Sequence, residues 1–202
     1  MAVLAPRPGT GRNGRHSRYA ALLLSLITAT GALTGCELLD AALDRGCEDS
    51  ERRIEEAESY GVLGSHPEGA IVPKGFEEVD SGCWADSGSA YVWADRTYVF
   101  PGDKAEVTAY YREAAKRDGW KLSGAYDPSG EYGERAKAGE PADLCFTLGK
   151  DDDSTILDVF FLAEGVLALD EERKPGPEFS SGSGYRVSID STADGSPNGC
   201  PD

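Results

Sequence analysis

Side chains that could carry out enzyme chemistry are scarce in this chain, apart from its carboxylates. It has two histidines, His16 and His66, and His16 lies within the basic N-terminal stretch. A Ser-His-Asp triad or a histidine-rich metal site would therefore depend on His66, which lies in the Pro/Gly-rich segment 65–75 and is expected to be exposed. Glu131 and Glu134 could act as an acid–base pair, but among 36 acidic residues such pairs arise by chance. No Gly-x-Ser-x-Gly elbow, phosphate-binding glycine loop or dinucleotide fingerprint occurs, so we predict no catalytic residue and no cofactor.

Two acidic stretches invite comparison with calcium-binding loops. Residues 151–153 are three consecutive aspartates, but Ile156 occupies the place of the turn glycine. The run 190–195, "DSTADG", matches the first six places of a calcium loop, but Pro201 stands where the bidentate glutamate belongs. We interpret both stretches as solvated turn acids and predict no metal site.

Aromatic residues offer a further possibility, because their rings could line a ligand cleft. Rings at strand and helix spacing are more typical of a hydrophobic core, and we interpret them in that way. The side chains concerned are Trp84, Tyr91, Trp93, Tyr98, Tyr110, Tyr111 and Trp120.

The N-terminal stretch has the pattern of a secretory signal peptide. Residues 1–18 are basic and rich in Gly and Pro, and an apolar run of about fifteen residues follows from Tyr19 to Leu33. A membrane-spanning helix needs about 20 apolar residues, so this run is too short to span comfortably. We expect residues 1–35 to be a signal peptide.

The apolar run ends in Leu33-Thr34-Gly35-Cys36, which resembles the bacterial lipobox. The resemblance implies that the Cys36 thiol receives a diacylglyceryl group and that a lipoprotein signal peptidase cuts between Gly35 and Cys36. Two acyl chains anchor a protein stably, since each buried methylene adds about 0.8 kcal/mol. The alternative is an ordinary signal peptide, or a buried helix, with a chance cysteine. The lipobox reading predicts an extracytoplasmic protein that is lipid-anchored to the bacterial cell membrane.

Four cysteines remain, and an even number outside the cytoplasm predicts two disulfides. Four cysteines allow three pairings. We favour Cys83–Cys145, because both lie in strand-like segments, together with Cys47–Cys200, which would tie the two ends of the domain. A zinc site is the alternative, but no C-x-x-C motif or neighbouring histidine supports it.

The order of the expected elements predicts the fold class. The clearest helix is 103–118, where Asp103 can cap the first turn and Gly119 can end the last; a peripheral helix is expected at 49–60. A helix, two strands, a helix and further strands predict an α+β fold with a mainly antiparallel sheet of about five to six strands. The helix 103–118 should pack on this sheet through Val107, Tyr110, Tyr111 and Ala114. Strands are expected at 77–85, 90–100, 120–126, 144–148, 155–163 and 185–191.

Length and charge complete the sequence-based prediction. The 202 residues suit a signal peptide at 1–35, a tether at 36–48 and one α+β domain at 49–202. The first 35 residues contain four arginines and no acidic residue, so the other 167 carry 16 basic and 36 acidic side chains, a net charge of −20. This charge repels nucleic acid and could attract a cationic ligand or a basic protein. We therefore expect a membrane-anchored, non-enzymatic binding module; the alternative is a surface-attached enzyme or calcium-binding protein that uses carboxylates.

Overall fold

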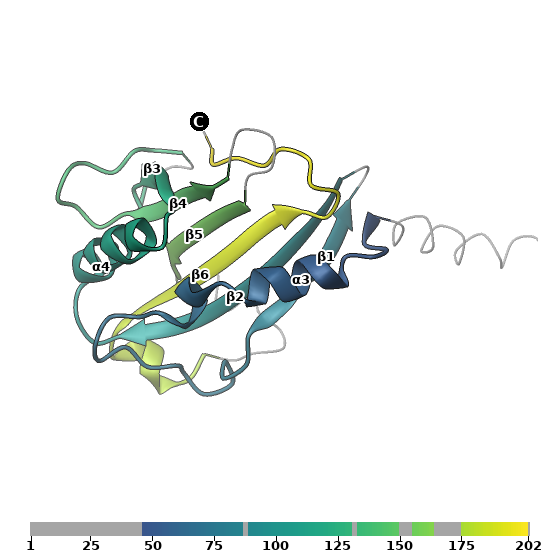
Figure 1. Ribbon diagram of the computed structural model, residues 1–202. Helices are drawn as coiled ribbons and strands as arrows, with labels where there is room; N and C mark the ends of the chain where they lie inside the picture. Colours follow the sequence, from purple (N-terminus) through teal and green to yellow (C-terminus); the bar gives the residue numbers. More distant parts are fainter. Residues whose placement is uncertain (1–45, 87–88, 131–132, 150–154, 164–174, 202) are drawn as a thin grey trace, which may run out of the picture. The chain divides into compact units, whose positions relative to one another are not determined.

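The described part of the chain belongs to one compact unit, residues 44–202. Figure 1 shows the computed structural model. The predicted signal peptide, Cys36 and most of the predicted tether lie outside the described residues, as do Glu131 and the stretch 151–153. No helix in the described part is long and apolar enough to cross a membrane. The structure describes residues 46–86, 89–130, 133–149, 155–163 and 175–201.

Six strands form one sheet in the order β1-β2-β6-β5-β4-β3, and all neighbouring pairs are antiparallel (Figure 1). The long strand β6 lies between the two predicted hairpins, β1–β2 and β4–β5, while β3 forms the far edge beside β4. The predicted α+β class, the mainly antiparallel sheet and the presence of two disulfides are confirmed. The strands are β1 (Asp80–Asp86), β2 (Ser89–Phe100), β3 (Lys121–Tyr126), β4 (Asp143–Leu148), β5 (Thr155–Phe161) and β6 (Ser183–Thr192).

Two helices pack on the sheet. The peripheral helix α3 (Glu51–Glu58) contacts β1, β2 and β6, and α4 (Lys104–Arg117) contacts β3 and β4. Figure 1 shows both in front of the same face of the sheet. Ala57 of α3 and Val107 and Tyr111 of α4 join one core cluster with side chains of the strands. The short 3₁₀ helix η2 (Gly61–Gly64) adds Val62 and Leu63 to this core.

Local sequence explains why α4 begins and ends where it does. The Asp103 carboxylate accepts a hydrogen bond from the Glu106 amide at 2.9 Å, as predicted for the cap. Gly119 has φ of +91°, the left-handed conformation that ends the helix, and Trp120 folds back so that its amide donates to the Ala115 carbonyl at 2.9 Å. The buried stripe of α4 differs from the prediction in two ways. Tyr110 is only partly buried, and Thr108 and Ala115 face the core as well.

Alternation along β2 defines two faces of the sheet. Val92, Ala94 and Tyr98 belong to the core cluster on the helix side, so Tyr91 and Asp95 point to the opposite side. Directly paired residues of antiparallel strands point to the same side, so the register extends this assignment across the sheet. The face that carries Asp95 is called the acidic face below.

The disulfides join Cys47 to Cys83 and Cys145 to Cys200, so the favoured pairing was wrong. Cys83 is paired with Val92 and therefore lies on the helix side. Cys145 is in one row of paired residues with Asp158, Ser188 and Asp95, so it lies on the acidic face. The two cysteines also stand on β1 and β4, four strand spacings or about 19 Å apart. A disulfide requires Cα atoms within about 7 Å, and the observed bridges have 5.8 Å and 5.9 Å. Each strand cysteine therefore bonds to a terminal segment that crosses its own face.

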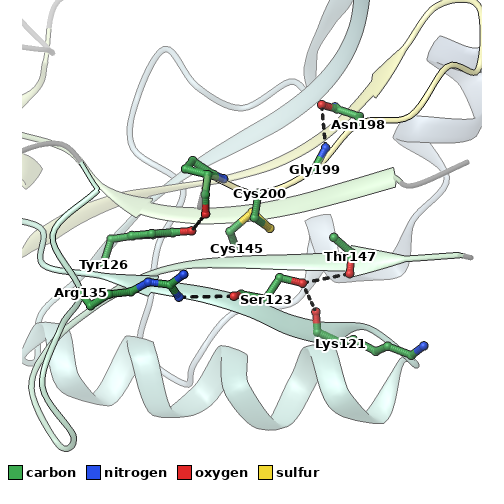
Figure 2. Close-up of a disulfide and its surroundings, with 10 residues drawn as sticks. Lys121, Ser123, Tyr126, Arg135, Cys145, Thr147, Asn198, Gly199 and Cys200 are labelled. Carbon is green, nitrogen blue, oxygen red and sulfur yellow. Dashed lines mark hydrogen bonds between the residues drawn. A yellow bond between two sulfur atoms is a disulfide. The ribbon is translucent and has the colours of Figure 1, made fainter. Parts of the chain in front are cut away.

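The C-terminal segment after β6 is held at β4 by the second disulfide. Figure 2 shows Cys200 bonded to Cys145, with the Tyr126 hydroxyl donating to the Pro201 carbonyl nearby. The Arg135 guanidinium lies over the Tyr126 ring, 5.1 Å from its centroid. Since β6 and β4 flank β5, the tail between Thr192 and Cys200 must pass β5 on the acidic face.

Candidate binding surface on the acidic face

A stacked pair of exposed aromatic rings is the most unusual surface feature of the described residues. Trp84 of β1 and Tyr91 of β2 are direct cross-strand partners, with ring centroids 6.2 Å apart and an interplanar angle of 23°. Trp84 is 55% exposed and Tyr91 36% exposed. Large aromatic surfaces are normally buried, so a stacked and exposed pair marks a candidate contact surface. We call Trp84 and Tyr91 the aromatic pair.

Trp93 extends this aromatic surface along β2. Its cross-strand partner is Gly82, and a Cβ built on Gly82 would lie only 2.8 Å from Cη2 of the Trp93 indole. The indole therefore lies across the backbone of β1 because residue 82 has no side chain. On its other side Trp93 is paired with Asp190 of β6, which places a carboxylate next to the rings.

Carboxylates follow the aromatic rings across the acidic face. The register aligns Asp95 of β2, Ser188 of β6, Asp158 of β5 and Cys145 of β4 in one row. Asp190 stands two residues beyond Ser188 on β6, and its Oδ2 accepts a hydrogen bond from the Ser188 hydroxyl at 2.7 Å. Three aspartates from three adjacent strands thus share one side of the sheet.

A cation from β6 forms an ion pair with one of these aspartates. Nη1 of Arg186 lies 3.6 Å from Oδ2 of Asp95, and Arg186 also donates to the Thr97 hydroxyl at 3.4 Å. Burial, followed by repulsion from Asp190 and Asp143, raises the pKa of Asp158 to about 7. Burial also raises the pKa of Asp190, although the hydrogen bond from Ser188 opposes the shift. The face therefore carries a cluster of carboxylates, of which Asp95 is paired with Arg186 while burial opposes the ionisation of Asp158 and Asp190.

The residues considered for enzyme chemistry do not meet on this face. His66 is exposed, as expected, and its ring lies 5.2 Å from that of Tyr98, whose side chain belongs to the core on the helix side. It therefore cannot complete a triad with Ser188 and Asp158. Glu134 lies in the loop beside Asp127, where its carbonyl accepts the Asp127 amide.

The better calcium-loop match does not fold as a loop. Residues 190–192 belong to β6, and only the part beyond Thr192 turns, where the Asp194 carboxylate accepts the Ser196 amide at 2.9 Å. That hydrogen bond lowers the pKa of Asp194. Among the described residues, no three His, Cys, Asp or Glu side chains are grouped so that they could hold a metal ion.

The aromatic residues named from the sequence separate into two sets. Tyr98, Tyr111 and Trp120 are buried in the core, as that interpretation predicts. The aromatic pair is exposed, so the interpretation as core was wrong for Trp84 and Tyr91. Sequence reasoning missed Asp95 and Asp158, yet each is an acidic residue inside a strand segment rich in apolar residues, "YVWADRTYVF" and "TILDVFF". A charge in such a segment is a signal that could have identified them.

A cleft also lies on the helix side of the sheet. It has a volume of about 360 Å³ and lies between α3 and the β4–β5 hairpin, with Arg52, Arg53 and Tyr60 in its wall. Its two guanidinium groups already serve the fold: Arg52 lies 3.7 Å from Glu56, and Arg53 donates to the Thr192 carbonyl at 3.0 Å. We therefore place the candidate site on the acidic face.

No protein-family model, curated protein or solved structure matches this chain. Two disulfides indicate that the domain matures in an oxidising, extracytoplasmic compartment.

Proposed function

We propose that this chain is an extracytoplasmic lipoprotein, anchored to the bacterial cell membrane through Cys36, whose α+β domain is a non-enzymatic binding module. The observation that carries the binding role is the exposed, stacked aromatic pair on the acidic face. Burying two such rings against a partner would recover the hydrophobic free energy that their exposure forgoes. The lipobox resemblance at Leu33–Cys36 and the oxidised cysteines support the location.

The anchor is tested by the intact mass of the full-length protein extracted from membranes of a bacterial host. We expect loss of residues 1–35 and an added diacylglyceryl mass at Cys36, with both changes absent in Cys36→Ser. Recovery of the wild-type protein from the cytosol with residues 1–35 attached and no acyl mass would contradict the anchor.

The binding role is tested by comparing partners captured from solubilised membranes by the wild-type protein and by Trp84→Ala/Tyr91→Ala. Leu122→Ala is the matched control, since Leu122 is also exposed, at 45%, but lies on the edge strand β3. We expect a partner that is lost with the aromatic pair and retained by the control. Equal capture by all three proteins would contradict a role for the pair.

A carboxylate enzyme is the second candidate, and the raised pKa of Asp158 is the observation that favours it. A group that titrates near neutral pH can exchange protons with a substrate. However, Cys145 and its disulfide stand beside Asp158 in the row, and the C-terminal segment crosses this part of the face. A covered carboxylate is better suited to setting the stability of the fold, and this account is tested below.

A further inference from the structure

We propose that the aromatic pair and the carboxylates beside it form one docking surface for an arginine-containing polypeptide segment of a partner protein. The proposal rests on the binding role of the domain but does not require the lipid anchor. It assigns a chemical class to the partner, which the presence of an exposed surface alone does not supply.

The geometry of the aromatic pair suits a planar cation. The Trp84 and Tyr91 rings stack on each other across adjacent strands and both are partly exposed, so aromatic surface remains accessible to a ligand. A guanidinium group stacks on such rings through its plane and is attracted by their negative faces. Arginine also retains in-plane donors that can reach a carboxylate while the group is stacked.

The charges on the same face complement this cation. Asp190 is the cross-strand partner of Trp93, so its partly buried carboxylate lies beside the rings. The guanidinium of Arg186 lies 3.6 Å from Asp95, two residues along β2 from Trp93. A basic segment that crosses these strands would meet negative charge after the rings, within a region whose net charge is −20.

The spacing sets the length of the segment. From Tyr91, Asp190 lies one strand across and two residues along, or about 8 Å. Extended chain advances about 3.4 Å per residue, so about two residues separate the contact with the rings from the contact with Asp190. Alternating arginines in an extended peptide reproduce this pattern.

Other occupants fit the charges less well. Nucleic acid and anionic phospholipid would be repelled by the carboxylates next to the rings. A neutral sugar could stack on the rings but would gain nothing from the excess of negative charge. A membrane surface nevertheless competes as an explanation, since Trp and Tyr also favour lipid interfaces, and the experiment includes it as an outcome.

The test measures fluorescence anisotropy of a labelled Gly-Arg-Gly-Arg-Gly-Arg-Gly peptide with the full-length protein in detergent micelles. We expect saturable binding that weakens as salt is raised. Trp84→Ala/Tyr91→Ala should weaken binding about tenfold, and Asp190→Asn several-fold. Leu122→Ala should stay within about twofold. The corresponding glutamate peptide should not bind, and a lysine peptide should bind more weakly than the arginine peptide.

A second variant guards against loss of fold in the alanine pair. Tyr91→Lys keeps a long side chain on β2 but places a positive charge in the surface, so it should abolish binding while the near-ultraviolet circular dichroism stays native. The proposal is overturned if the arginine peptide does not bind, if it binds all variants equally, or if the glutamate peptide binds as well. It is also overturned if the acyl-free protein, Cys36→Ser, binds phosphatidylcholine vesicles through the aromatic pair in preference to the peptide.

These outcomes are independent of the anchor. Peptide binding by a protein that lacks acyl mass would refute the lipoprotein assignment and retain the docking surface. Lipidation without peptide binding would retain the lipoprotein assignment and refute the docking surface.

Discussion

Cys145 of β4 and Asp158 of β5 are direct cross-strand partners on the acidic face, so the disulfide to Cys200 lies beside the Asp158 carboxylate. Directly opposed side chains have Cβ atoms about 5 Å apart. The bridge that holds the C-terminal segment therefore contributes to the burial that raises the pKa of Asp158 to about 7. We therefore expect the oxidation state of this cysteine pair to influence the charge of the acidic face.

Asp158→Asn should stabilise the domain at alkaline pH. The pKa of Asp158 is about 7 in the folded protein and about 3.9 in an unfolded chain, so ionisation favours unfolding. The penalty is absent below about pH 4, grows between pH 4 and 7 and is complete above pH 7. We expect the variant to raise the free energy of unfolding by about 1–3 kcal/mol at pH 8 and to change it little at pH 4.

Chemical denaturation at the two pH values measures this effect. Glu113→Gln, at an exposed position on α4, is the control and should leave the stability within about 0.5 kcal/mol at both. Equal stability of Asp158→Asn and the wild-type protein at pH 8 would show that the carboxylate is not desolvated.

Removing the two disulfides one at a time should distinguish their contribution to stability from an effect on the pKa of Asp158. The bridges close loops of 36 and 55 residues, and on the chain-entropy model each contributes up to about 4 kcal/mol. Cys145→Ser/Cys200→Ser should also lower the pKa of Asp158, because the C-terminal segment is released from the acidic face. Cys47→Ser/Cys83→Ser is the matched control. It should also destabilise the domain, but its disulfide lies on the helix side, so the pKa of Asp158 should stay unchanged.

Carboxyl-carbon NMR of Asp158 across the pH range, together with denaturation, distinguishes the two double variants. An identical pKa of Asp158 in both would disprove the coupling. Peptide mapping under non-reducing conditions should first identify Cys47–Cys83 and Cys145–Cys200 in the wild-type protein.

Gly82→Ala should displace the Trp93 indole. The new methyl group would lie 2.8–2.9 Å from two ring carbons, closer than atoms in contact permit, so the ring must tilt away from β1. We expect a shifted tryptophan emission maximum and a loss of about 1 kcal/mol in stability. Gly61→Ala is the comparison, because a Cβ there meets nothing within 4 Å, and it should leave the emission unchanged.

Thr108→Val should destabilise the contact between α4 and the segment before β4. The buried Thr108 hydroxyl donates to the Ala142 carbonyl at 3.1 Å and accepts from the Ala142 amide at 3.0 Å. The isosteric valine leaves both backbone groups buried without that partner, which should cost about 2–3 kcal/mol. Thr147→Val removes only an exposed hydrogen bond to Ser123, 3.0 Å long, and thermal unfolding should show a loss below about 0.5 kcal/mol.

Much of the fold follows from local pattern. The "AYVWADRTYVF" strand, the capped helix after Asp103 and the Gly119 stop were predictable because alternation, capping and left-handed backbone are properties of neighbouring residues. The binding surface was harder to predict from the sequence, since aromatic residues occur both in the core, at Tyr98, and on the surface, at Trp84.

By itself the sequence determined the α+β class, the order of the elements, the charge, and that four cysteines beyond the lipobox-like segment were available to form two bridges. The tertiary structure alone decided which cysteines bond, which rings are exposed and which aspartates share a face. The reason is register: whether a strand residue faces the helices or the acidic side depends on which strand lies next to it. Strand order and pairing bring together residues far apart in the chain, and no local pattern specifies them.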